Sequence, residues 1–201
     1  LKKSYNNKNI TILDSSRCFN QIDLAVLQEI INLNKSLNGM KPLELGKQSW
    51  QDRRLIYLYV DKQSLNMLPE SIGDLSSIEV LSLNNNNLIS LPERLGDLSN
   101  LEGLAIDNNE IISLPGSIWK LSNLTELHCN NNKITIIPES IGKLKNLQRF
   151  HISKNKLFTL PKSIGSLTRL EYLDVSNNQI TLLPKTICLL HLNIYFNSFI
   201  A

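Results

Sequence analysis

Residues Ile78–Asn100, IEVLSLNNNNLISLPERLGDLSN, form one copy of a pattern that returns every 23 residues. An earlier copy begins at Leu55, and later copies begin at Leu101, Leu124, Leu147 and Leu170. The shared pattern reads LxxLxLxxNxLxxLPxxIGxLxx, with Ile for the first Leu in the copy quoted above. A fixed period of this length is the sequence signature of a solenoid, in which each repeat packs only on its neighbours.

Each part of the repeat predicts a local structure. The LxxLxL part has a period of two, which predicts a strand with Leu81 and Leu83 facing the core. The LPxxIG part predicts that Pro92 starts a short helical turn and that Gly96 permits a tight bend. The Asn between them is expected to bond backbone groups of adjacent coils that would otherwise be buried without partners. This predicted column comprises Asn86, Asn109, Asn132, Asn155, Asn178 and Asn197.

The repeat resembles the leucine-rich-repeat family, in the 23-residue LPxxIGxL subclass of Ras-pathway and Erbin-like scaffolds, plant intracellular proteins and many bacterial proteins. The resemblance covers roughly residues 40–201. The predicted fold class is therefore α/β, a right-handed solenoid with a concave parallel β-sheet and short convex helical or 3-10 turns. The resemblance also implies a binding surface for another protein and no enzymatic activity.

The N-terminal part departs from the repeat. Residues 1–39 are expected to hold an extension and a capping helix, because apolar residues recur at helical spacing between Asn20 and Leu37. Asn20 and Asp23 have the spacing of a capping box. For residues 1–19, an additional strand and an ordered extension both remain open.

The repeat domain is predicted over residues 40–201, with a degenerate repeat over 40–54, full repeats from residue 55, and a truncated repeat from 189. A truncated repeat leaves a strand edge without a neighbour, which favours self-association through the C-terminal edge strand. The start at Leu1 and the abrupt end also fit an alternative, a ligand-sensing or targeting domain of a larger signalling protein.

Composition excludes several function classes. The 201 residues carry a net charge of +3, and they show no basic patch interleaved with aromatic residues, so nucleic acid is not an expected partner. No apolar run approaches the roughly 20 residues that a membrane helix needs. Cys18, Cys129 and Cys188 form no disulfide framework and are expected to be small buried side chains. Without paired cysteine caps, a cytoplasmic or a bacterial secreted protein is favoured. Trp119 replaces a repeat glycine and is expected to be half-packed over a bend.

Strand residues that do not face the core are predicted to line the concave face. The first outward column is Tyr57, Val80, Gly103, Glu126, Arg149, Tyr172 and His191; the second is Tyr59, Ser82, Ala105, His128, His151, Asp174 and Asn193; the third is Asp61, Asn84, Asp107, Asn130, Ser153, Ser176 and Tyr195. The scaffold does not require aromatic residues there, and exposed Tyr, His and Arg are typical binding anchors. The candidate partner-binding residues are Tyr57, Tyr59, Glu126, His128, Arg149, His151, Tyr172 and Asp174.

Charge is segregated along the chain. Residues 61–119 carry nine acidic and two basic residues, a net charge of −7, whereas residues 120–170 carry nine basic and two acidic residues, a net charge of +7. Such a distribution favours steering of a polar partner along the solenoid, or head-to-tail self-association.

His128, His151 and Asp174 follow one another in the second column, on strands expected about 4.8 Å apart. They are a candidate mixed nitrogen and oxygen ligand set for a metal, or the centre of a carbohydrate-binding surface. His151 and Asp174 with Ser153 also have the residue types of a base, an orienting acid and a nucleophile, but no oxyanion loop accompanies them. We therefore predict a non-enzymatic module without cofactors that binds a protein on its concave face, with a metal- or carbohydrate-binding surface as an alternative.

Overall fold

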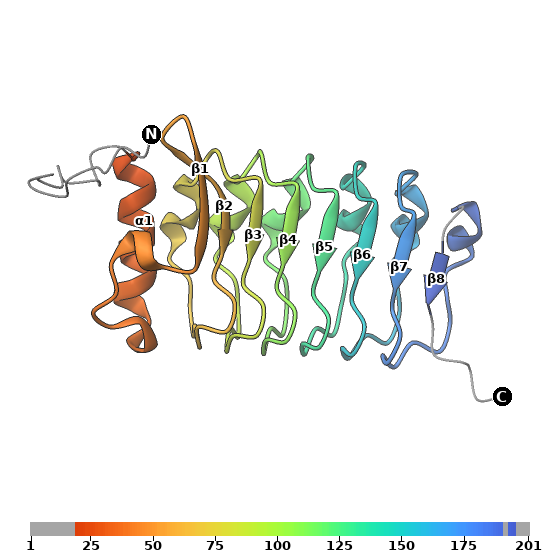
Figure 1. Cartoon of the computed structure of the whole chain (residues 1–201). Helices are drawn as coiled ribbons and strands as arrows, with labels where there is room; N and C mark the ends of the chain where they lie inside the picture. Colours follow the sequence, from red (N-terminus) through yellow and green to blue (C-terminus); the bar gives the residue numbers. More distant parts are fainter. Residues whose placement is uncertain (1–18, 191–192, 196–201) are drawn as a thin grey trace, which may run out of the picture.

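The computed structural model describes residues 19–190 and 193–195. Figure 1 shows a row of similar coils with one long helix against the first of them. Within these residues, eight strands form one sheet, in the order of the chain. They are β1 (Lys47–Gln51), β2 (Arg54–Tyr59), β3 (Val80–Ser82), β4 (Gly103–Ala105), β5 (Glu126–His128), β6 (Arg149–His151), β7 (Tyr172–Asp174) and β8 (Asn193–Tyr195).

Helical segments complete the coils. The long helix is α1 (Gln21–Leu33), and two short 3-10 helices follow it, η2 (Lys35–Leu37) and η3 (Pro42–Glu44). The 3-10 helices of the repeats are η4 (Glu70–Asp74), η5 (Glu93–Asp97), η6 (Gly116–Lys120), η7 (Glu139–Lys143), η8 (Lys162–Ser166) and η9 (Lys185–Leu189). No described helix is long and apolar enough to cross a membrane.

The strands alternate as the repeat predicts. In β3, β4 and β5 the central residues Leu81, Leu104 and Leu127 are almost completely buried, and the residues on either side point outward. From β2 to β8 all neighbouring strands pair in parallel. Burial of one apolar stripe per coil drives the stacking, because each coil covers its apolar face only on the next one. The predicted solenoid fold is confirmed.

The predicted Asn column forms hydrogen bonds between coils. Asn109 accepts from the Leu88 amide at 3.0 Å, and its Nδ2 donates to the carbonyls of Leu83 at 3.0 Å and Ile106 at 3.1 Å. The side chain thus satisfies buried backbone groups of its own coil and of the preceding one. The same pattern recurs at Asn86, Asn132, Asn155 and Asn178. Asn197 lies outside the described residues.

A second column of side chains caps the convex turns. The Glu93 carboxylate accepts hydrogen bonds from the Gly116 and Ser117 amides, both at 3.1 Å, at the start of the next 3-10 helix. These amide donors lower the pKa of Glu93, because they stabilise the ionised form. Glu70 and Glu139 make the same contacts with the next coil. The convex glutamates are therefore part of the scaffold.

The repeat glycines let adjacent 3-10 helices approach closely. A Cβ at Gly96 would lie 2.5 Å from the Ser117 carbonyl oxygen, and a Cβ at Gly165 would lie 2.4 Å from that of Thr186. Trp119 stands at the equivalent place in the coil from residue 101, and its side chain is buried, not half-packed as expected. Trp119 belongs to η6. Among the neighbouring pairs from η4 to η9, η6 and η7 make the least extensive contact.

The helix α1 is fixed to the first coil by a buried ion pair. Asp23 is fully buried and accepts from Nε and Nη2 of Arg54, both at 2.9 Å, and from the Leu55 amide at 2.8 Å. The expected capping box with Asn20 is wrong, because the Asp23 carboxylate faces Arg54 instead. Asn20 alone caps α1, accepting from the amides of Ile22 and Asp23.

The helix also ends earlier than expected. It stops at Leu33, and the buried side chain of Asn34 then donates to the Met67 carbonyl at 3.0 Å and accepts from the Asn66 amide at 2.7 Å. Asn34 therefore satisfies backbone groups of the LxxLP segment in the first coil.

Within residues 40–54, the strand β1 forms a hairpin with β2 and is not the parallel strand of a degenerate repeat. The strand β1 pairs antiparallel with β2, and residues 42–44 form the 3-10 helix η3. The hairpin turn places Asp52 and Arg53 at φ of 49° and 70°. Two successive residues with positive φ match the twist of a tight hairpin. Because this turn joins β1 directly to β2, the two strands are antiparallel.

The last coil is shorter than the others, which corrects the predicted register of β8. Ile194 pairs with Leu173, and Tyr195 pairs with Asp174, so Tyr195 belongs to the second outward column and Asn193 to the first. The sequence-based register was wrong by two residues, because two residues are missing between η9 and β8 relative to the preceding coil. Cys188 is exposed, contrary to expectation, whereas Cys129 is buried.

Candidate functional site

The strand register places all eight predicted binding residues on the outward face of β2 to β7. Tyr57 and Tyr59 lie on β2, and the other six lie on β5, β6 and β7. Cα pairing joins Glu126 to Arg149 and His128 to His151 across β5 and β6. Between these two groups lie Gly103 and Ala105 on β4. The face therefore has large side chains at both ends and small ones in the middle. His191 lies outside the described residues.

Four ring side chains form a continuous stack across this face. His128 and His151 stack with centroids 4.3 Å apart and planes at 10°, and His151 stacks on Tyr172 at 4.5 Å and 24°. Tyr172 and Tyr195 follow at 4.9 Å, with their planes tilted by 33°. We call His128, His151, Tyr172 and Tyr195 the ring ladder. It crosses from the second outward column to the first and back, a path that the sequence columns did not predict.

Charged groups border the ring ladder at β5 and β6. Glu126 forms an ion pair with Arg149 on the neighbouring strand, and its other carboxylate oxygen lies 3.5 Å from Nε2 of His128. At the opposite end of the face, a hydrogen bond with Glu79 raises the pKa of Tyr57, so its hydroxyl stays protonated. The β2 end of the face thus presents phenol hydroxyls to a partner, and the other end presents imidazole, phenol and guanidinium groups.

The third outward column is a hydrogen-bonded ladder. Asp61 accepts from the Asn84 amide at 2.7 Å, Asn84 accepts from Asp107, Asp107 accepts from Asn130, and Asn130 accepts from Ser153. Burial raises the pKa of Asp107. These side chains join successive coils, so this column belongs to the scaffold and leaves two columns for recognition. Sequence reasoning missed this role, although the recurrence of Asp, Asn and Ser at one position was visible.

The geometry does not favour the metal and catalytic readings. Stacked imidazoles lie parallel, so His128 and His151 do not converge on one ion, and Asp174 accepts from the Ser176 amide at 3.0 Å. Among the described residues, no three or more His, Cys, Asp and Glu side chains are arranged to hold a metal ion. The Ser153 hydroxyl donates to Oδ1 of Asn130 at 2.8 Å, so its partner is an amide oxygen of the scaffold and not an imidazole.

Comparison with known proteins agrees with this geometry. Residues 81–157 match a family model described as a leucine-rich repeat region, and residues 169–190 match a leucine-rich-repeat model. The chain contains a leucine-rich-repeat domain. A search of curated proteins finds no match to it.

Solved leucine-rich-repeat structures resemble the domain. A leucine-rich-repeat protein of Leptospira interrogans is 32% identical over 71% of this chain and 44% of its own, with a TM-score of 0.53. The plant peptide hormone receptor RGFR1, solved in complex with RGF2, is 32% identical over 70% of this chain and 24% of its own, with a TM-score of 0.62. The ectodomain of the receptor kinase SOBIR1 from Arabidopsis thaliana is 26% identical over 83% of this chain and 96% of its own, with a TM-score of 0.68. The chain thus spans less than half of the first two proteins.

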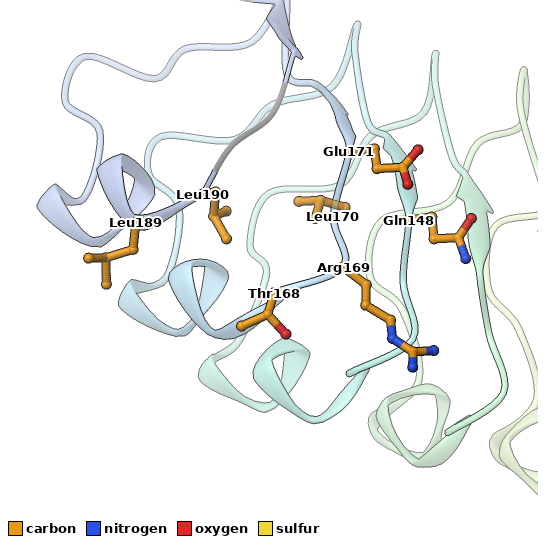
Figure 2. A pocket seen from close by; sticks show the side chains of 7 residues that line it. All are labelled: Gln148, Thr168, Arg169, Leu170, Glu171, Leu189 and Leu190. Carbon is orange, nitrogen blue, oxygen red and sulfur yellow. The ribbon is translucent and has the colours of Figure 1, made fainter.

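A hollow of about 570 Å³ lies beside the short last coil of the leucine-rich-repeat domain. Figure 2 shows the side chains that line it, namely Gln148, Thr168, Arg169, Leu170, Glu171, Leu189 and Leu190. The lining residues precede β6, β7 and β8 in the chain and do not belong to the outward columns. The hollow is therefore separate from the ring ladder.

The ring ladder predicts a pH dependence of stability. Burial lowers the pKa of His151 below its ordinary value of 6.5, and nearby His128 lowers it further. The folded state therefore binds fewer protons than the unfolded state near this pH, so the contribution of His151 is fully present above 6.5 and is lost as the pH falls. We expect the melting temperature to fall between pH 7 and pH 5 through this group. The variant His151→Gln should lose that part of the drop, and an unchanged pH profile would contradict the assignment.

Proposed function

We propose that the leucine-rich-repeat domain binds a segment of another protein on its concave face, between Tyr57 and the ring ladder. The observation that carries the proposal is the ring ladder itself. Four half-buried or exposed rings stand on the outward face of β5 to β8, where the scaffold needs only compact side chains that leave the strands paired. Aromatic residues on an exposed sheet face contribute large contact areas at low entropic cost.

The direction of the rings indicates what the partner presents. The ring faces that meet within the ladder are covered by their neighbours, which leaves the imidazole nitrogens and phenol hydroxyls for contacts with a partner. Such groups suit hydrogen bonds with peptide groups and polar side chains better than the flat contacts by which aromatic faces bind sugar rings. This favours a polypeptide over the carbohydrate alternative.

The small residues in the middle of the face provide room for a side chain of the partner. Gly103 and Ala105 lie between Tyr57 and Tyr59 on one side and His128 on the other. A Cβ added at Gly103 would meet only Val80, at an ordinary distance of 3.5 Å, so the backbone there does not require glycine. Small residues bordered by large ones are typical of a pocket for an anchor residue.

The relatives support a role in recognition. Leucine-rich-repeat proteins generally serve as non-enzymatic binding scaffolds, and RGFR1 was solved in complex with RGF2. The chain spans 96% of the SOBIR1 ectodomain, which is one part of a receptor kinase. This coverage favours a second candidate, in which the domain is the ligand-sensing part of a larger signalling protein. The complete open reading frame distinguishes a signalling protein from a free-standing binding module.

Loss of partner binding is the direct test of the concave face. We expect the triple variant Tyr57→Ala, Arg149→Ala and Tyr172→Ala to bind the partner with less than about 1% of the wild-type affinity. Several central anchors are removed together in this variant. Affinity capture followed by titration of the captured protein measures this loss. The filling variant Gly103→Tyr should block the same partner while the fold stays intact.

The controls separate recognition from folding. Lys143→Ala removes an exposed positive charge from the convex helix η7 and matches the charge change of Arg149→Ala. It should bind like the wild type. Equal binding by the triple variant, with an unchanged melting temperature, would place recognition elsewhere. Hydrogen exchange of the complex should then protect the convex turns and not β2 to β7.

A further inference from the structure

Six large apolar side chains are exposed in a row along one flank of the solenoid. Each repeat contributes one of them. It is one of the two variable residues of the LxxLP segment that follows the strand. Their exposed fractions range from 49% to 76%. We call this row the flank ridge, and its members are Met67, Ile89, Ile112, Ile136, Phe158 and Leu182. It is a different surface from the concave face.

Backbone hydrogen bonds join the coils that carry the flank ridge. The Glu110 amide donates to the Leu88 carbonyl, and the Lys133 amide donates to that of Ile111, at 2.9 and 2.8 Å. Equivalent bonds connect the other coils on this flank. Single exposed apolar residues are ordinary, but a contiguous line of them typically marks a binding surface.

The scaffold does not account for this row. In each repeat the apolar residues on either side, such as Leu88 and Leu91 around Ile89, already fill the core or pack against it. The exposed position therefore has no packing function within the coil. Polar residues would serve as well there, and Asn66, Ser90 and Ser113 occupy the adjacent exposed positions of the same segments.

Charges beside the flank ridge change sign at its middle. From three residues before to one residue after each LxxLP segment, the first three repeats carry three acidic residues and one lysine, and the last three carry five lysines and one acidic residue. The first group is Lys62, Glu70, Glu93 and Glu110, and the second is Lys133, Glu139, Lys154, Lys156, Lys162 and Lys185. The ion pair between Glu110 and Lys133 lies at the boundary.

We propose that the flank ridge binds a second copy of this chain in antiparallel orientation. A two-fold axis between Ile112 and Ile136 would pair each ridge residue with one from the other half of the partner. It would join Ile112 to Ile136, Ile89 to Phe158, and Met67 to Leu182. The same axis places the acidic half of each copy against the basic half of the other.

The sign change is what selects a second copy as the occupant. A lipid surface of anionic headgroups would attract the lysine half but repel the acidic half. A parallel pairing of two copies would bring acid to acid and lysine to lysine. Antiparallel pairing covers all six apolar side chains and gives every charged half an opposite partner.

Sedimentation of the whole chain tests the proposal. We expect a reversible dimer, and we expect Ile89→Lys with Phe158→Lys to weaken it at least about tenfold, because these residues meet across the axis. Ile22→Lys changes an equally exposed isoleucine on α1 and should leave the dimer unchanged. Small-angle scattering should show a dimer scarcely longer than the monomer. A monomer at every concentration, or a dimer about twice as long joined through the C-terminal edge, would overturn the proposal.

Disulfide trapping tests the orientation. In a background with Cys18 and Cys188 replaced by serine, Ile89→Cys alone and Phe158→Cys alone should not cross-link, whereas an equal mixture of the two should form one disulfide-linked dimer. Linking of each single variant to itself would indicate parallel pairing and overturn the proposal. Sedimentation of a monomer with anionic vesicles would assign the ridge to a membrane surface instead. The concave-face variants leave the ridge intact, so they should dimerise normally.

Discussion

Replacing Asp23 with alanine is expected to lower the free energy of unfolding by about 3–5 kcal/mol. The carboxylate is fully buried and accepts three hydrogen bonds, two from Arg54 and one from the Leu55 amide. Alanine would leave the Arg54 guanidinium, which is only 26% exposed, without its carboxylate partner. It would also leave the Leu55 amide buried without an acceptor. The helix α1 would then lose its main polar attachment to the first coil.

Chemical denaturation measures the overall loss, and hydrogen exchange locates it. Each coil contacts only its neighbours, so we expect α1, β1 and β2 to lose protection before β5 and β6 do. Asp97→Ala is the matched control, because Asp97 forms an exposed ion pair with Arg94. It should cost less than about 1 kcal/mol. If both variants lose stability to the same small extent, the buried pair does not fix the cap.

The second large effect is expected in the Asn column. Asn132→Ala should cost about 2–3 kcal/mol, because it removes the acceptor of the Ile111 amide and the donor to the carbonyls of Ile106 and Cys129. These backbone groups are buried between two coils and have no access to water. The position lies in the middle of the solenoid, so the break would uncouple its two halves.

Arg149→Ala is the comparison for this variant. Arg149 is exposed on the concave face, and its ion pair with Glu126 is exposed as well, so the melting temperature should change little. Thermal unfolding of both variants tests whether stability and recognition belong to separate columns of the repeat. A large loss with Arg149→Ala would mean that the outward column also holds the scaffold together.

Much of the candidate site followed from the sequence. The two-residue period of a strand places Tyr57, Glu126 and Tyr172 on the outward face of the sheet. The 23-residue spacing sets which residues of neighbouring strands lie side by side. The ring ladder did not follow, because stacking of His151 on Tyr172 depends on side-chain rotamers and on the distance between strands. The position of Tyr195 also depended on the length of the last turn, which the repeat pattern does not specify.

What the sequence alone determined is the coil. Apolar, Asn, Pro and Gly positions recur in most coils, and each has one local use that does not depend on distant residues, so the solenoid and the Asn column could be derived from spacing. Only the tertiary structure decided the ends of the solenoid and its surfaces. The first coil has no repeat before it, and there the direction of β1 and the ion pair between Asp23 and Arg54 follow from contacts between segments outside the repeat. Trp119 is an atypical residue at a repeat position, and its burial follows from its contacts between coils. The flank ridge emerged in the same way, because one exposed apolar residue per repeat carries no signal until the coils are stacked and the residues lie in one line.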